Sequence, residues 1–243
     1  MIIFYGNYPK SWLIKLKNIP DSKLCSTIEE LKESQHSHII PLMENHALEL
    51  HDNNINAKMP SKYCIEIFMS KKLFYEYATL NNLIKYIPKT YNRQEDIGKM
   101  FIVKEYNRSA GNGIYLTHLV DKMEFGKKIV QEYIADKDEY TAHIVANNGV
   151  IKCHIIYKFE FDKTNHIKGK MVPKKMQKIT IHRRYIDILE QFLLPCKYDG
   201  ICNIDFKIKC GEIKVFEINP RFGGSIIENK DTSDLLKIIT GLT

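Results

Sequence analysis

Polar and apolar residues alternate along much of the chain from residue 99 onward, which predicts a region rich in strands. Side chains on a strand point by turns to the two faces of its sheet, so alternation marks a strand with one buried face. We expect strands at residues 100–106, 113–117, 129–134, 140–146 and 150–161. Strands in runs with few crossover helices favour an α+β protein with antiparallel sheets.

Helical spacing interrupts these strands at residues 182–194. Apolar side chains recur there at intervals of three and four positions, which predicts an amphipathic helix that Pro195 ends. Ser70 is the expected N-cap of an earlier helix. Four apolar side chains form the expected stripe of that helix: Leu73, Phe74, Tyr77 and Leu80.

The first 60 residues follow a third pattern. Short apolar runs at 2–5 and 39–42 predict two strands, and residues 26–32 form an expected helix opened by a Ser or Thr cap. Asn53 and Asn54 are the expected break near the end of this part. We therefore expect a small α/β segment ahead of the strand-rich region.

Composition excludes several classes of protein. With 44% apolar residues, 11 Phe and 14 Tyr in 243 residues, the chain can fold around its own core and is not a disordered protein. No run approaches the roughly 18 consecutive apolar residues of a membrane span. The first residues lack the pattern of a signal peptide. We expect a cytoplasmic protein with no membrane partner.

The net charge of +7 points to an anionic ligand. Nucleic acid would suit this charge, but the sequence contains no nucleic-acid-binding motif. The densest basic stretch, residues 168–178, also has no interleaved aromatic residues that would stack on bases. A small anion explains the charge better than nucleic acid does.

Cysteine and histidine do not predict a metal site. The six cysteines are scattered without a CxxC pair, and their apolar neighbours predict mostly buried free thiols. Several histidines gather near the amino end without the HExxH arrangement of a zinc enzyme. We interpret these histidines as structural or solvated: His36, His38, His46 and His51.

The strongest chemical signal is a hairpin at residues 202–219. If its loop holds Cys210, Gly211 and Glu212, Asp205 lies opposite Glu217 on one face. The other pairs are then Asn203 with Asn219 on the same face, and Ile204 with Ile218 and Phe206 with Phe216 on an apolar face. A two-residue loop would instead pair Asp205 with Phe216 and mix the two faces.

Two carboxylates across a strand pair, about 5 Å apart, repel each other unless a cation lies between them. Oxygen ligands suit Mg²⁺, which also binds substrate phosphates. The alternative is an ordinary hairpin with a solvated polar face. Arg221 follows the second strand and offers bidentate recognition of phosphate or carboxylate. With the flexible residues 223–225, these features together predict a phosphoryl-transfer site.

Residues 205–225, which end in EINPRFGGS, resemble the metal-binding signature of the ATP-grasp superfamily. The resemblance is greatest to the branch that contains carbamoyl phosphate synthetase large chains and stand-alone carboxylate–amine ligases. It extends upstream to about residue 61 through the motifs SKKLF, FIVK, RSAGNG and IVQEYI…DEYT. It implies an ATP-grasp fold, in which two α+β lobes with antiparallel sheets sandwich ATP, behind a reduced N-terminal α/β segment.

The resemblance also implies a division of the chain and roles for its residues. Residues 1–60 would be the shortened N-terminal segment, 61–130 the small lobe with the glycine-rich phosphate loop, and 131–243 the large lobe with the metal site. Lys72 competes with Lys71 for a phosphate role. The implied ATP-binding residues are Lys71, Lys104, Gly111, Gly113, Gln131, Glu132, Tyr133, Ile134 and Glu139. The implied catalytic residues are Arg221 and Lys158, and the implied metal ligands are Asp205, Glu217 and Asn219.

The implied activity is the ATP- and Mg²⁺-dependent ligation of a small-molecule carboxylate to an amine through an acyl phosphate, with Mn²⁺ as an alternative ion. Relatives carry a larger N-terminal domain, so we expect an abbreviated acceptor site and a homodimer. Two alternatives stay open. One is a kinase that stops at phosphorylation of its acceptor, and the other is a non-catalytic nucleotide-binding module.

Overall fold

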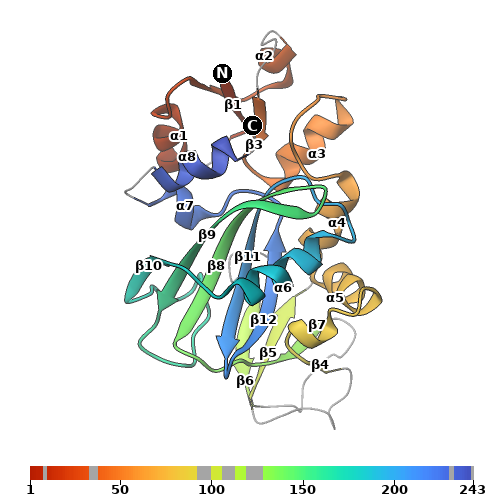
Figure 1. Cartoon of the computed structure of the whole chain (residues 1–243), viewed down its shortest axis with the longest axis vertical. Helices are drawn as coiled ribbons and strands as arrows, with labels where there is room; N and C mark the ends of the chain where they lie inside the picture. The colour runs from red at the N-terminus through yellow and green to blue at the C-terminus, as the bar shows by residue number, and fades with distance from the viewer. Residues whose placement is uncertain are drawn as a thin grey trace.

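Three sheets organise the computed structural model of the chain (Figure 1). The structure describes residues 1–7, 10–32, 38–91, 100–105, 113–118, 128–229 and 233–241. A three-stranded parallel sheet has the order β2-β1-β3, and two antiparallel sheets have the orders β4-β7-β5-β6 and β10-β9-β8-β11-β12. The predicted α+β class is confirmed. None of the helices in these ranges has the length and apolar character needed to span a bilayer.

The parallel sheet forms the N-terminal end of the molecule. β1 (Ile2–Tyr5) lies between β2 (Ser22–Cys25) and β3 (His38–Pro41), and the helices α1 (Lys10–Lys17), α2 (Ile28–Lys32) and α3 (Glu44–Asp52) connect or follow these strands. Thr27 Oγ1 accepts a hydrogen bond from the Glu30 backbone at 3.3 Å and opens α2. The short α/β segment expected in this part of the chain is confirmed.

Helices α4 (Lys62–Met69) and α5 (Lys71–Leu80) follow this segment. Ser70 caps α5 as expected, because its hydroxyl accepts from the Leu73 backbone at 3.3 Å. The predicted stripe is wrong at both flanks, since Leu73 is 39% exposed and Leu80 81% exposed. Phe74 and Tyr77 turn toward α6 (Arg183–Leu193), where the Phe74 ring stacks on Phe192 at 5.9 Å. This contact sets the rotation of α5.

The four-stranded sheet confirms three expected strands to within about two residues. After a 3-10 helix, η1 (Ile84–Tyr86), it contains β4 (Thr90–Tyr91), β5 (Phe101–Glu105), β6 (Ile114–Thr117) and β7 (Lys128–Glu132). Phe101, Val103 and Val130 form its small core. The last residue but one of β5, Lys104, is also buried, which brings a positive charge to this sheet.

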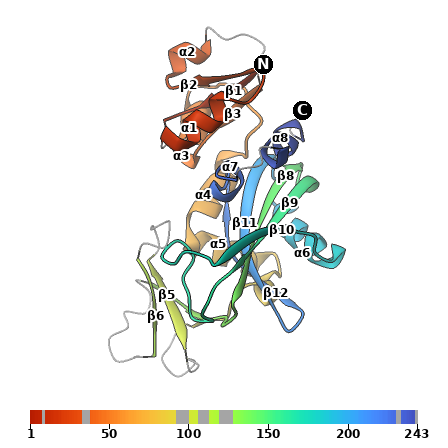
Figure 2. The same cartoon turned by 90° about the vertical axis from the view of Figure 1, so that its left-hand side faces the viewer.

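The five-stranded sheet is the largest, with β8 (Asp138–Asn147), β9 (Val150–Glu160), β10 (Lys175–Ile179), β11 (Gly200–Lys209) and β12 (Glu212–Asn219). α6 covers its apolar face through Leu189 and Phe192, and the expected helix at 182–194 is confirmed. The short helices α7 (Gly224–Ile227) and α8 (Ser233–Thr240) pack with β9 near the N-terminal segment. Figure 2 shows the segment between β9 and β10 reaching toward β5 and β6.

The hairpin of β11 and β12 corrects one prediction and confirms another. Asp205 lies opposite Glu217 and Ile204 opposite Ile218, as expected. The loop holds only Cys210 and Gly211, whose φ angles of 51° and 80° suit a two-residue turn. The three-residue loop and the pair of Phe206 with Phe216 are therefore wrong, because Phe206 pairs with Val215. A β-bulge at Phe216 adds one residue and restores the expected pairs.

The cysteines mostly lie where their apolar neighbours predict. Four are buried, Cys153 is half-buried and Cys210 is exposed in the hairpin turn. The buried ones are Cys25, Cys64, Cys196 and Cys202.

Candidate active site

One face of the five-stranded sheet carries rows of polar side chains from three neighbouring strands. Thr141 of β8 pairs with Asp205 of β11, which in turn pairs with Glu217 of β12. Because side chains on a strand repeat every two residues, the next row shares this face. That row consists of His143, Asn203 and Asn219. The opposite face is the apolar one under α6, and within the polar face His143 and Asn203 of the second row are buried.

Asp205 is held by two donors. The Thr141 hydroxyl donates to Asp205 Oδ1 at 2.5 Å, and Lys168 Nζ lies 2.6 Å from the same oxygen. Lys168 also donates to the Thr141 hydroxyl. Burial would raise the pKa of Asp205, but the ammonium group of Lys168 and these hydrogen bonds outweigh it and lower the pKa. Asp205 therefore keeps its charge inside the protein.

Glu217 has the opposite electrostatic environment. Burial and the neighbouring Asp205 raise its pKa, although Lys104 and Lys71 oppose the shift. Asn219 Nδ2 donates to Glu217 Oε1 at 3.3 Å and to Asn203 Oδ1 at 3.2 Å, which leaves the amide oxygen of Asn219 as a ligand atom. The two half-buried carboxylates on adjacent strands thus differ, since their surroundings favour the charged form of Asp205 and disfavour that of Glu217.

This donor set fits a magnesium ion. Asp205, Glu217 and Asn219 offer carboxylate and amide oxygens, which Mg²⁺ prefers, and two carboxylates with an amide leave positions for phosphate oxygens and water. No cluster of three or more His, Cys, Asp or Glu side chains suited to a metal occurs among the described residues. His36 lies outside them. The oxygen donors on β11 and β12 are the side chains that would hold such an ion.

Two lysines approach Glu217 from other elements. Burial lowers the pKa of Lys104 to about 8, while Glu217 raises it and Lys71 lowers it further. Burial also lowers the pKa of Lys71, against the effect of Glu217. Lys72 instead forms an exposed pair with Glu76 at 3.8 Å. Of the two competing lysines, the structure brings Lys71 to this group. Lys104 Nζ lies 5.8 Å from the ring centre of the bulged Phe216.

Glu139 lies farther along the polar face, buried at 6% exposure. Its Oε2 is 3.2 Å from His166 Nε2 and 3.9 Å from Lys207 Nζ. The His166 ring stacks on Phe161 with centroids 3.8 Å apart, and the Tyr133 hydroxyl accepts from the His166 backbone at 2.8 Å. These contacts tie Glu139 to the segment that follows β7.

The expected adenine-binding residues lie at the end of β7 and just beyond it. Gln131 is buried and donates to Thr90 Oγ1 at 3.0 Å. The backbone amide of Glu132 donates to Lys89 O at 2.8 Å. The carbonyl of Ile134 accepts from Lys207 Nζ at 3.0 Å. Residues 131–134 are therefore anchored to the four-stranded and the five-stranded sheets, through backbone groups as well as side chains.

The glycine-rich loop is described only at its end. Gly113 has a φ of 66°, a conformation that favours glycine, and its carbonyl accepts from the Glu105 backbone at 3.0 Å. Gly111 lies outside the described residues. The expected phosphate role of this loop stays a prediction.

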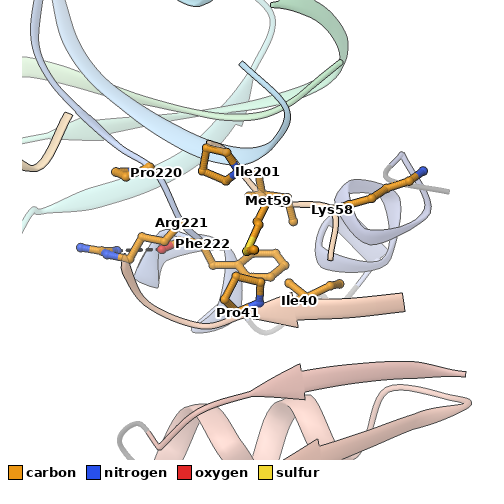
Figure 3. A pocket seen from close by; sticks show the side chains of 9 residues that line it. Ile40, Pro41, Lys58, Met59, Ile201, Pro220, Arg221 and Phe222 are labelled. Atoms are coloured by element: carbon orange, nitrogen blue, oxygen red, sulfur yellow. Dashed lines mark hydrogen bonds between the residues drawn. The ribbon is translucent and has the colours of Figure 1, made fainter. Parts of the chain in front are cut away.

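Arg221 contacts the N-terminal segment. Its Nε donates to Glu44 Oε1 at 2.9 Å, and its Nη1 donates to Phe222 O at 2.7 Å. Figure 3 shows the guanidinium group directed away from the small cavity between Ile40, Met59 and Phe222. This cavity measures about 10 Å³, room for one water molecule at most, and cannot hold a substrate.

Lys158 does not join the polar group. It pairs with Tyr140, which lies on the opposite face of β8 from Thr141, and its Nζ forms an ion pair with Asp138 at 2.5 Å. Lys158 lies on the expected strand, β9, but on the face opposite the polar group. Lys168, from the segment between β9 and β10, supplies the cation beside Asp205 instead.

Sequence reasoning also missed four other members of the polar face. Thr141 and Lys207 each lie two residues from a predicted site residue on the same strand, so alternation could have indicated them. His143 lies one step further along β8 and bonds Ser225 Oγ through Nε2 at 2.8 Å. No spacing could have indicated His166, because it lies in a segment without a regular pattern.

Comparisons with known proteins bear on the family and the fold of this chain. The family model ATP-grasp_3, an ATP-grasp domain, matches residues 69–225. The structure resembles D-alanine–D-alanine ligase from Bacillus anthracis (TM-score 0.64, 13% identity, 100% of this chain and 96% of that chain). It also resembles an L-amino acid ligase from Bacillus licheniformis (TM-score 0.68, 12% identity, 98% and 73%). A third resemblance is to phosphoribosylamine–glycine ligase from Thermotoga maritima (TM-score 0.71, 12% identity, 99% and 75%). At these identities the likeness concerns the fold. A search of curated proteins found no match.

Proposed function

Because this chain belongs to the ATP-grasp family, we propose that it is an ATP- and Mg²⁺-dependent ligase that joins a small-molecule carboxylate to an amine through an acyl phosphate. The observation that carries the proposal is the pair of half-buried carboxylates, Asp205 and Glu217, with Lys71 and Lys104 close enough to change the pKa of Glu217. Structurally similar proteins named as ligases support the class of reaction.

Asp205, Glu217 and Asn219 would hold the magnesium ion. Such an ion supplies charge that neutralises phosphate oxygens as the phosphoryl group moves. Mn²⁺ would suit the same oxygen donors. The rest of the work falls to the protein, which binds and orients the two reacting groups.

Lys71 and Lys104 would bind the phosphates. Burial holds the pKa of Lys104 at about 8, so the charged form is only modestly favoured at neutral pH. A triphosphate beside it would favour the ammonium form, because opposite charges a few ångströms apart raise the pKa of a lysine. Nucleotide binding would thus fix the charge of this lysine.

In the proposed reaction, a carboxylate oxygen of the acceptor attacks the γ-phosphorus and ADP leaves. The amine then attacks the carbonyl carbon of the acyl phosphate, loses a proton, and phosphate leaves with the original carboxylate oxygen. Arg221 would contact the acyl phosphate, since its planar guanidinium group suits such anions. Glu44 keeps that guanidinium group in one orientation through the contact at 2.9 Å.

The division at residues 60 and 130 is also a proposal. Three sheets within residues 2–41, 90–132 and 138–219 support two boundaries, and because β7 (Lys128–Glu132) belongs to the four-stranded sheet, the second boundary is better placed after residue 132. A homodimer remains part of the proposal, and light scattering of the purified protein tests it.

The test is a screen for ADP release over amino acids and small carboxylates, alone and in pairs. An active pair should give ADP, phosphate and an amide by mass spectrometry. An ¹⁸O-labelled carboxylate should transfer one ¹⁸O to phosphate, which reports the acyl phosphate. Glu217→Gln is the matched control, and it should abolish release. A stable phosphorylated acceptor would assign a kinase, and equal rates for wild type and variant would contradict the proposed site.

A further inference from the structure

Lys168 forms an ion pair with Asp205, a carboxylate that we propose as a metal ligand. Its ammonium group is 2.6 Å from Asp205 Oδ1 and donates to the Thr141 hydroxyl as well. The pair is enclosed, with 27% of the Lys168 side chain and 14% of the Asp205 side chain exposed. Lys168 Nζ also lies 4.5 Å from the ring centre of Phe159, which shields the pair from water.

The three lysines of the site divide its negative charge between them. Lys71 and Lys104 act on Glu217, whereas Lys168 acts chiefly on Asp205. Burial would lower the pKa of Lys168, but Asp205 and Glu139 outweigh it and raise the pKa. The ammonium group therefore supplies, beside Asp205, the positive charge that two opposed carboxylates require.

The segment that carries Lys168 is fixed on both sides of it. His166 is buried against Glu139 and Phe161 on the N-terminal side. On the C-terminal side the Lys174 backbone donates to Glu160 O at 2.8 Å, and Lys170 Nζ donates to Ile114 O of the four-stranded sheet at 2.5 Å. The segment can therefore stay in place while the long side chain of Lys168 moves.

An ammonium group and a divalent cation compete for one carboxylate, because like charges a few ångströms apart repel each other. Binding of the ion at Asp205 is therefore expected to weaken the contact of Lys168 with that carboxylate. The side chain then lies beside the position that the phosphates of a metal-bound nucleotide would take, and these are the nearest new source of negative charge.

We propose that Lys168 is a tethered cation that neutralises Asp205 in the nucleotide-free protein, yields this place to the divalent ion, and then contacts the phosphates of the nucleotide. The last step rests on the proposed function, whereas the exchange at Asp205 concerns metal binding alone. Lys168, and not Lys158, is then the third phosphate lysine of the site.

Metal affinity without nucleotide tests the exchange. Mn²⁺ binding, followed by electron paramagnetic resonance, should be about tenfold tighter in Lys168→Met than in the wild type, since one competing charge-assisted contact is lost. Lys174→Met is the matched control, because Lys174 lies in the same segment and forms only an exposed pair with Asp162 at 3.9 Å. The control should bind Mn²⁺ as the wild type does.

Unchanged or weaker Mn²⁺ binding by Lys168→Met would overturn the exchange. If that variant does not fold, as judged by circular dichroism, Lys168→Gln takes its place with the same expectation. Asp205→Asn should bind Mn²⁺ weakly whether or not Lys168 is also replaced. If Lys168→Met still tightened Mn²⁺ binding in the Asp205→Asn background, that result would equally overturn the exchange.

Nucleotide affinity tests the phosphate contact. At saturating Mn²⁺, Lys168→Met should bind a non-hydrolysable ATP analogue about tenfold more weakly, with AMP binding unchanged. Equal losses for both nucleotides, or none for either, would refute the contact. These measurements need no turnover, so a failed screen for ligase products would refute the proposed function and leave the exchange standing.

Discussion

Lowering the pH from 7 to 5 should destabilise this protein through His143. The side chain is completely buried in β8, where Nε2 bonds Ser225 Oγ at 2.8 Å. Its Nδ1 has no hydrogen-bond partner among the described residues. Burial, helped by the charge of Lys168, lowers the pKa of His143 from 6.5 to about 3, while Asp205 and Asp234 oppose the shift. The folded protein therefore holds this ring neutral.

The sign of the effect follows from proton uptake. Between pH 6.5 and about 3 the unfolded chain binds a proton at His143 that the folded chain does not, so stability falls as the pH falls through this window. From pH 7 to pH 5 the loss amounts to about 2 kcal/mol, at roughly 1.4 kcal/mol per pH unit below 6.5. For a chain of this size that corresponds to about 4–8 °C in Tm.

The assay is thermal unfolding followed by circular dichroism at several pH values for the wild type and His143→Gln. Glutamine can still donate to Ser225 and does not titrate, so the variant should lack this part of the pH dependence. The difference in Tm between the two proteins should shrink or reverse as the pH falls. Parallel curves would refute the reasoning, because they would mean that His143 titrates alike in the folded and unfolded chains.

Three further predictions concern the site. Lys104→Met should lower kcat/KM for ADP release on the order of 100-fold. The Tm should stay unchanged or rise, because burying the ammonium group at 7% exposure costs desolvation free energy, and a lower Tm would contradict this. Lys71→Met should weaken the binding of an ATP analogue, which calorimetry can measure. Lys158→Met should change the same affinity less than about twofold, because Lys158 lies on the other face of the sheet. Glu44→Gln should lower ligase activity about tenfold by freeing Arg221, and should add little to the loss caused by Arg221→Lys; additive losses in this double-mutant cycle would show that the pair does not act together.

Much of the fold could be predicted because alternation has a direct physical cause. A strand with one buried face must alternate, so β5 to β9 and the β11–β12 hairpin lie close to their expected positions, whereas β10 was not predicted. Residues 63–68 were harder, since a short apolar run fits a buried strand or a helix equally well. The structure makes them part of α4, whose N-cap Ser61 accepts from the Cys64 backbone at 3.3 Å.

The candidate site was only partly predictable, because the pairing of two strands in a hairpin is local in sequence, whereas the packing of distant segments against that hairpin is not. Asp205 and Glu217 are 12 positions apart on one hairpin, so their meeting could be read from the pattern. Lys168 meets Asp205 from a segment without periodicity, 37 residues away. Arg221 meets Glu44 across 177 residues. Contacts of this kind depend on how whole sheets pack, which no local pattern records.

The bulge at Phe216 separates the two ends of the β11–β12 hairpin. The turn end has the register of a two-residue loop, and the carboxylate end has the register of a three-residue loop. An extra residue inserted at the turn could therefore be absorbed by loss of the bulge, with Phe206 then opposite Phe216 and Glu217 still opposite Asp205. The exposed tip can change in length over evolution without moving the metal ligands, and Phe216 is the residue that gives this hairpin its tolerance.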